Sequence, residues 1–378
     1  MNIFGRKSVK AAAVVRLARP MASLLGSGIP GEAPRSWESD VREAYLGNAV
    51  AQRSVRLVAE SVGGAPLLVD DPDLLALVAA TSAGQGLLET CAAQLLLHGN
   101  AYIQVLTGAD GSLCELFALR PERVTVEPGP TGWPVAYLYR VSGRTVRLPA
   151  QDAAGRPAVI HVKTMHPLDD HYGAGALCAA AGAVRAHNAA ARWHRALIDN
   201  AARPSGVLVY DPGEPGATLS EAQFERLKAE MAAGYQGAAN AGRPMLLDGG
   251  LKWQAVGMSP ADMDFGALKD AAAREVAMAF GVPPMLIGLP GDATYANYRE
   301  ASRALWRLTV LPLAGKLLGA IRQGLNPWFA GVRLEVDLNQ VTALAEDREK
   351  LWSQVSGADF LSDAEKRALL GIVVEDVA

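Results

Sequence analysis

The middle of the chain constrains the fold most, because two long helical patterns flank a segment rich in turns. Residues 176–200 favour one helix that ends at Pro204-Ser205-Gly206. A second helix is predicted from Ser259-Pro260, where a capping hydroxyl precedes a proline in the first helical turn, and it ends at Gly281. Its length of about twenty residues corresponds to a rod of roughly 30 Å. Residues 205–257 contain short strands, a helix that begins after Ser220, and Gly/Pro-rich turns.

The second helix carries an apolar stripe at helical spacing. Its members are Phe265, Leu268, Ala272, Val276 and Phe280. In a monomeric domain this stripe would belong to an ordinary core helix. A rod that leads out to a Gly/Pro-rich excursion and back fits an assembly better.

The first half of the chain predicts helices packed on an antiparallel sheet, an α+β arrangement. Residues 1–36 form a flexible N-terminal arm with basic, Gly and Pro residues. Helices are expected at 39–62, although Gly47 weakens this one, and at 86–98. Strands are expected at 101–106, 113–119, 124–127, 135–139 and 159–162, with Asp110-Gly111 as a hairpin turn.

The C-terminal third is mostly helical. Residues 295–323 predict a long helix that must bend at Pro312, because proline removes a backbone donor. A strand at 332–338 and a charged helix at 344–355 follow. Ser362 and Glu365 form a capping box for a last short helix.

Length and charge bound the function. A chain of 378 residues exceeds the usual size of a single core, so two or three sub-structures are expected. The formal net charge is −3, whereas proteins that grip nucleic acid through phosphates usually carry a basic excess. This charge argues against tight sequence-specific DNA binding and leaves open a conduit past which DNA slides.

The cysteines and the apolar runs indicate the compartment. Cys91, Cys114 and Cys178 have neither metal-site nor disulfide-scaffold spacing, and are expected to be small buried residues in a reducing compartment. No apolar run reaches the length of a membrane span; the best candidate, 308–321, is interrupted by Pro312 and Lys316. The sequence therefore predicts a protein kept inside a cell, with no membrane partner.

Catalytic motifs are missing from the sequence. It has no GxxxxGK[ST], HExxH or GxSxG pattern, and a lone Gly173-Ala174-Gly175 is weak evidence for a phosphate loop. We therefore predict no catalytic residues, no enzyme activity, no cofactor and no metal. One dense cluster leaves an alternative open: a metal-dependent nuclease or transferase could use His161, His166, Asp169, Asp170 and His171. A polar loop explains their irregular spacing better.

The order of several segments resembles the phage portal protein family over residues 40–370. The passage Asn200-Ala201-Ala202-Arg203-Pro204-Ser205-Gly206-Val207-Leu208 is similar to the family's "n-g-a-x-p-s-G-x-L" boundary. Residues 234–253 look like its "G-x-x-n-a-g-k-p-x-v-l-x-x-g-x-x-w". The most specific match is Ala279-Phe280-Gly281-Val282-Pro283-Pro284, followed at 294–298 by Thr-Tyr-Ala-Asn-Tyr. Residues 363–367 depart from the usual "x-N-E-x-R", with Ala364 where asparagine is common. The long-tailed-phage type, which also occurs in gene transfer agents, is the best match.

This resemblance implies a portal fold that assembles as a ring, usually of twelve subunits, at one capsid vertex. Wing, stem, clip and crown would follow in the chain. The implied parts are the wing at 37–175 and 282–325, stem helices at 176–204 and 258–281, the clip at 205–257 and the crown at 326–378. The wing's second part would contain a channel loop and the bent helix.

The implied function is a DNA channel for genome packaging, head-tail joining and DNA ejection. The implied partners are further copies of the chain, non-specific double-stranded DNA, the terminase packaging motor, a head-tail adaptor and the major capsid protein. The ring would assemble in the bacterial cytoplasm and remain at the portal vertex of a virion or virion-like particle. A third hypothesis, a monomeric scaffolding adaptor, stays open.

The resemblance also suggests functional residues. The segment 288–303 would approach the channel axis, and the DNA-channel candidates are Tyr295, Asn297, Arg299 and Arg303. The stem-packing candidates are Phe265, Leu268, Val276 and Phe280. A wing-packing or intersubunit role competes with each channel candidate: Tyr295 is expected to pack, and both arginines could pair with acids such as Glu300.

Overall fold

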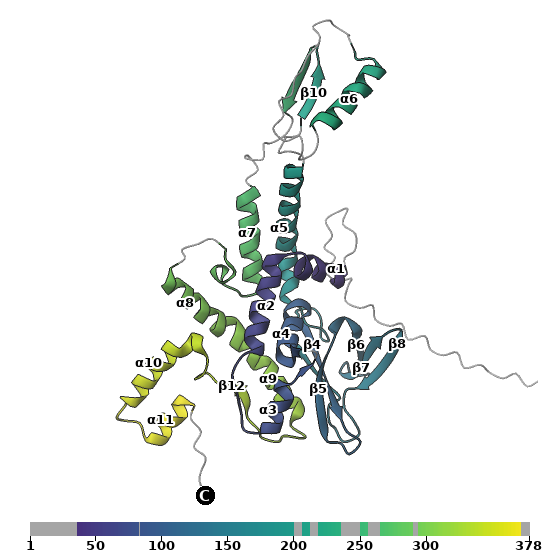
Figure 1. The fold of residues 1–378 in the computed structure, drawn as a ribbon. Helices are drawn as coiled ribbons and strands as arrows, with labels where there is room; N and C mark the ends of the chain where they lie inside the picture. Colours follow the sequence, from purple (N-terminus) through teal and green to yellow (C-terminus); the bar gives the residue numbers. More distant parts are fainter. Residues whose placement is uncertain are drawn as a thin grey trace, which may run out of the picture.

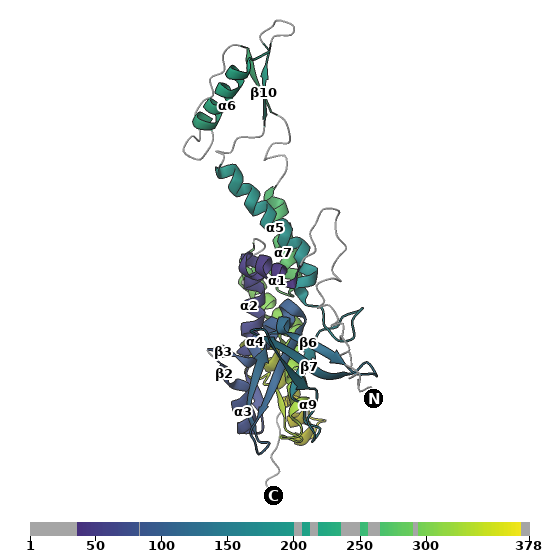
Figure 2. The same ribbon diagram turned by 90° about the vertical axis from the view of Figure 1, so that its right-hand side faces the viewer.

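The computed structural model describes residues 36–82, 84–199, 206–211, 218–235, 250–255, 265–289 and 294–371. A large body of helices and small sheets carries a two-helix stem, and a small unit lies beyond the end of the stem (Figure 1, Figure 2). The predicted α+β class is confirmed, as is the antiparallel pairing of the strands.

The N-terminal helix differs from its prediction. Residues 39–62 were expected to form one helix, but α1 (Trp37–Val41) continues as a π-helical turn at Arg42–Leu46, and α2 (Ala49–Gly63) starts afresh. The break falls at Gly47, because the Asn48 side chain caps α2: its Oδ1 accepts a hydrogen bond from the Ala51 backbone N–H at 2.9 Å. Asn48 also donates to Asn188 on α5 (Ala176–Asp199) at 2.8 Å, so the break fixes α2 against the stem.

Two three-stranded antiparallel sheets form the lower body. In one, β4 (Asn100–Thr107) lies between β5 (Leu113–Leu119) and β9 (Val159–Lys163); in the other, β7 (Pro134–Val141) lies between β6 (Val124–Pro128) and β8 (Arg144–Pro149). The sequence did not predict β8, α3 (Pro72–Ala79) or the short pair β2 (Thr81–Ser82) and β3 (Gln85–Gly86). It also missed β1 (Leu67–Val69), which pairs with β12 (Leu334–Val336) from the far end of the chain.

The main hydrophobic core lies where α2, α4 (Leu87–His98) and α9 (Leu311–Leu325) meet the lower ends of the stem helices α5 and α7 (Phe265–Ala279). Fully buried side chains come from all of these elements, including Val55, Leu95, Val184, Val276 and Leu317. The stem is therefore rooted in the body core. A second, smaller cluster fills the contact between the two sheets around Tyr102 and Tyr137.

Three glycines allow the loop before α5 to lie directly against the end of α4. Gly99 caps α4 with a positive φ of 77°, a conformation that favours glycine. A Cβ on Gly173 would lie 2.1 Å from the Gly99 carbonyl oxygen, and a Cβ on Gly175 would lie 2.9 Å from the Gly99 nitrogen. The Gly173-Ala174-Gly175 segment thus serves close backbone packing, which explains the GxG pattern without a phosphate.

The long C-terminal helix accommodates its proline through a π-helical turn. Helix α8 (Tyr295–Leu305) passes into a π turn at Trp306–Val310, directly before α9 and Pro312. A wider turn at this point is a common response to a proline that cannot donate to the preceding turn. Thr309, within this turn, donates to the Gly281 carbonyl at 2.7 Å and so joins it to the end of α7.

The same continuous helix corrects the expectation about membrane spans. By length and composition alone, Tyr295–Leu325 is the one helix within the described ranges that would be able to cross a membrane. Pro312 does not interrupt it, so the apolar residues run on in one element. Its apolar face lies in the main core, where Leu305, Val310, Leu317, Ile321 and Leu325 are buried. Packing inside the body accounts for this composition.

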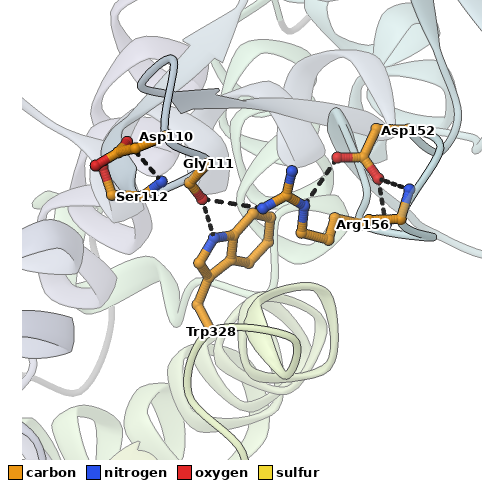
Figure 3. A network of polar contacts seen from close by, with 7 residues as sticks. Asp110, Gly111, Ser112, Asp152, Arg156 and Trp328 are labelled. Carbon is orange, nitrogen blue, oxygen red and sulfur yellow. Dashed lines mark hydrogen bonds and ion pairs between the residues drawn. The ribbon is translucent and has the colours of Figure 1, made fainter.

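A polar network fixes the tip of the β4–β5 hairpin to the end of α9 (Figure 3). The Gly111 carbonyl accepts hydrogen bonds from Trp328 Nε1 and Arg156 Nη1, both at 3.0 Å. Arg156 also lies over the Trp328 ring at 5.5 Å and pairs with Asp152 at 2.8 Å. Asp110-Gly111 forms the predicted turn, with Asp110 accepting from Ser112. The hairpin and α9 are therefore held together although their residues are more than 200 positions apart.

The C-terminal unit contains α10 (Ala345–Ser356) and α11 (Asp363–Leu370). The predicted capping box of Ser362 and Glu365 is present at the start of α11. The unit beyond the stem contains β10 (Gly206–Tyr210) paired with β11 (Leu251–Ala255), and α6 (Glu221–Tyr235). The predicted strand at 244–248 and the predicted cap at 259–262 lie outside the described residues.

The three cysteines do not share one environment. Cys91 is buried, and desolvation raises its pKa to about 12. Cys114 and Cys178 are exposed, so the expectation that all three are buried was wrong. The alternating pattern around Cys114 places it on the outward face of β5.

Candidate functional site

The stem is a pair of helices, α5 and α7, which lie side by side (Figure 1). At its outer end, the Trp193 ring stacks on Phe265 with centroids 3.9 Å apart. At its base, Val276 and Phe280 are buried in the main core. Leu268 lies between these ends and is 48% exposed. The predicted stripe therefore divides: Phe265, Val276 and Phe280 pack within the chain, whereas Leu268 faces outward.

The base of the stem is coupled to the long C-terminal helix at Gly281. This residue ends α7 with a φ of 68°, and a Cβ there would lie 2.5 Å from Thr309 Oγ1. The Val282 backbone N–H donates to the Ala277 carbonyl at 2.9 Å, which completes the helix end. The π turn and the stem are thus in direct contact through a site that admits only glycine without strain.

The start of α8 displays polar and aromatic side chains. Thr294 caps the helix by accepting a hydrogen bond from the Asn297 backbone N–H at 3.2 Å. Tyr295 is 80% exposed, and the Arg299 guanidinium lies 5.4 Å from its ring centroid. The expectation that Tyr295 packs does not hold within its own chain. Tyr295, Asn297 and Arg299 therefore share one exposed helix start.

Arg303 has a different environment from the other three candidates. Its side chain is only 14% exposed and lies near three carboxylates: Glu300 at 2.9 Å, Glu346 at 2.8 Å and Asp347 at 3.4 Å. Arg299 also pairs with Glu346. Glu346 and Asp347 stand in the first turn of α10, where acids are favoured by the helix dipole. The arginines thus tie α8 to the C-terminal unit, as the competing sequence hypothesis of acid pairing expected for Glu300.

The histidine-rich loop holds the fold together through its own hydrogen bonds. His161 Nε2 bonds to Asn100 Oδ1 at 3.1 Å, and its ring stacks on Tyr102 with centroids 4.3 Å apart. Asp169 accepts from the backbone N–H groups of His171 and Tyr172. The described residues contain no group of three or more His, Cys, Asp or Glu that would hold a metal ion. The metal-dependent alternative finds no support in this geometry.

Two buried imidazoles of this region predict a pH dependence of stability. Burial lowers the pKa of His161 to about 3 and that of His98 to about 4, whereas an unfolded histidine titrates near 6.5. Below pH 6.5 the unfolded chain therefore binds protons that the folded chain does not, and folding becomes less favourable. We expect each imidazole to reduce the free energy of unfolding by up to about 2 kcal/mol between pH 6.5 and 5. Denaturant titrations at several pH values measure this slope; His161→Gln should reduce it, and an unchanged slope would contradict the assignment.

The sequence did not reveal Asn100, which organises this region. Its side chain is fully buried, accepts from the Gly173 N–H at 2.8 Å and donates to the Gly173 carbonyl at 3.3 Å. An asparagine after a helix-ending glycine is common in turns, so only its position beside a buried strand could have drawn attention. Glu346 and Asp347 were missed as well, because they lie more than 40 residues from Arg303.

Comparisons with known proteins match this architecture. The profile of the phage portal protein family matches residues 49–371. A chain in the virion of a native gene transfer agent particle is 48% identical, with a TM-score of 0.69 over 92% of this chain and 96% of that one. A chain from the neck of the native particle, computed with C12 symmetry, is also 48% identical, with a TM-score of 0.68 over 93% and 97% of the two chains. The probable portal protein of Streptomyces phage phiC31 is 28% identical over 76% of this chain and 62% of its own length.

Proposed function

The chain belongs to the phage portal protein family, and from this premise we propose that a ring of copies conducts double-stranded DNA through one capsid vertex. The portal role itself rests on the family match and on 48% identity to a chain of the gene transfer agent neck. The twelve-fold symmetry of that neck supports a homododecamer located at the portal vertex of a virion-like particle. The family is structural, so the work of the protein is to form a passage, with no bond made or broken.

We assign the parts of the portal to the described elements as follows. Helices α5 and α7 are the stem, within 176–204 and 258–281. The β10–β11 pair with α6 is the clip, within 205–257. The sheets with α1 to α4 form the first part of the wing, 37–175, and α8 with α9 forms the second, 282–325. The segment 326–378, with α10 and α11, is the crown. The small clip unit at the far end of the stem supports this order (Figure 2).

The clip carries the surface that we propose for the terminase motor and, later, the head-tail adaptor. A shallow cavity of about 490 Å³ opens there between β10 and the start of α6. Tyr210, Leu219 and Phe224 line it, and the Phe224 side chain is exposed. The major capsid protein would contact the wing. These partners follow from the part that each element plays in a portal.

The start of α8 supports the channel assignment best. A portal must pass every DNA sequence, so its contacts should reach phosphates and not base edges. Tyr295, Asn297 and Arg299 occupy an exposed helix start, whereas the charge of Arg303 is already balanced by its own carboxylates. We therefore propose that the first three approach DNA, and that Arg303 positions α8. A near-neutral chain of net charge −3 suits loose guidance, because a uniformly basic wall would hold the DNA.

A paired substitution tests the channel role. Tyr295→Ala with Arg299→Gln should keep the yield of rings and change the DNA content per particle, because the contacts are electrostatic and repeated around the ring. The effect should weaken at high salt. Arg322→Gln, which removes an exposed arginine from α9, is the matched control and should change neither quantity. Loss of rings would assign these residues to the subunit interface, and unchanged DNA content in intact rings would remove them from the mechanism.

A further inference from the structure

The C-terminal unit exposes more apolar surface than its own contacts cover. Phe360 is 87% exposed, Leu369 55% and Trp352 42%. Only Val355 and Leu370 are buried within α10 and α11, together with Leu344 just before them. Large apolar side chains that lie together in a small unit usually mark an interaction surface. This unit is too small to bury three more of them inside itself.

The unit is attached to its own chain mainly by polar contacts. None of its described residues, 345–371, contributes to the main core. The carboxylates of Glu346 and Asp347 pair with Arg303 on α8, and Arg348 donates to Asn339 and to the Leu370 carbonyl at 2.7 Å. Helices α10 and α11 lie to one side of the body, next to α8 (Figure 1). These ion pairs fix the start of α10 and leave Phe360 and Leu369 uncovered.

We propose that the exposed apolar residues Trp352, Phe360 and Leu369 dock against the C-terminal unit of the adjacent copy in the ring. Charge selects this occupant: residues 345–371 contain six acidic and four basic residues, a net charge of −2. A net negative surface disfavours DNA phosphates, whereas side chains of both signs can pair with a second copy of the same unit. In a closed ring each copy presents one face to the next, so a single docking surface is used at every position. The Arg303 ion pairs then orient the unit toward its neighbour.

This inference rests on the proposed ring, and hydrogen exchange of the full-length protein tests it directly. Backbone amides at 349–371 should be protected in assembled rings and exchange faster in subunits dissociated at low concentration. Phe360→Ser with Leu369→Ser should abolish that protection and weaken assembly about tenfold or more, since two large apolar side chains lose their buried contact. Trp133→Ser, which removes an equally exposed aromatic residue between β6 and β7, should have no effect on either readout.

The outcomes separate this inference from the ring itself. Rings that form normally while 349–371 stay unprotected would overturn the docking surface and leave the portal function intact. Absence of rings in the wild-type protein would instead contradict the proposed function. Circular dichroism of the double variant should match the wild type, because neither residue is buried in the chain. If the double variant also assembles like the wild type, the docking surface lies elsewhere.

Discussion

Val276→Asp is expected to prevent the chain from folding stably. Val276 is fully buried in the main core at the base of the stem. An unpaired carboxylate there would cost about 4 kcal/mol or more, a large part of the 5–15 kcal/mol that stabilises a typical domain. Thermal unfolding and the yield of soluble protein measure the loss. The sequence placed Val276 at a contact between stem helices and expected rings to be lost with much secondary structure retained. Its burial in the body core is the reason for the stronger effect expected here.

Leu268→Asp is the matched control on the same helix. Leu268 is 48% exposed, so an aspartate there remains hydrated and the subunit should fold with nearly unchanged stability. Any effect should appear in ring formation, because Leu268 is the stripe residue that faces outward from the stem. Equal stability of the two variants would contradict the assignment of Val276 to the core.

Gly173→Ala is expected to destabilise the chain by about 3 kcal/mol or more. The added Cβ would lie 2.1 Å from the Gly99 carbonyl oxygen and 2.8 Å from the Thr164 nitrogen and oxygen. These are backbone atoms, so relief requires the loop before α5 to move away from the end of α4. Such a shift would also break the two hydrogen bonds between Asn100 and Gly173. Denaturant unfolding at pH 7 gives the free energy of unfolding.

Gly182→Ala provides the comparison for this substitution. Gly182 lies inside α5 with no heavy atom within 4 Å of its hypothetical Cβ. Alanine there should stabilise the chain by about 0.5–1 kcal/mol, because it reduces the freedom of the unfolded backbone and favours the helix. A destabilisation of similar size in both variants would show that the loss does not arise from the close contact at Gly173.

Most elements could be predicted from the sequence because their patterns are local. The stem helices, the strand at 101–106, the hairpin turn at Asp110-Gly111 and the capping box at Ser362 depend on residues close together in the chain. β8 escaped because it is an edge strand with mostly exposed residues and no apolar alternation. α3 escaped because its short, nearly continuous apolar run has little helical periodicity. The pairing of β1 with β12 joins residues more than 250 positions apart, and no local pattern encodes it.

The candidate site was predictable only in part for a similar reason. The order of motifs indicated the segment around Tyr295 and Arg299, and the helix there begins where the Thr294 cap is expected. The sequence could not distinguish the two arginines. Their difference arises from Glu346 and Asp347, which a later turn of the chain brings within 4 Å of Arg303. Whether the start of α8 reaches DNA depends on contacts between copies, which a single chain does not contain.

The central claim is that copies of this chain close into a ring with a central passage. Native mass measurement of the purified full-length protein, combined with negative-stain imaging of the same sample, tests it most directly. We predict a particle with twelve times the 39.8 kDa mass of the chain, and end-on views that show a ring with a central hole. A species of 39.8 kDa at every concentration, with no ring in the images, would contradict the account and favour the monomeric adaptor.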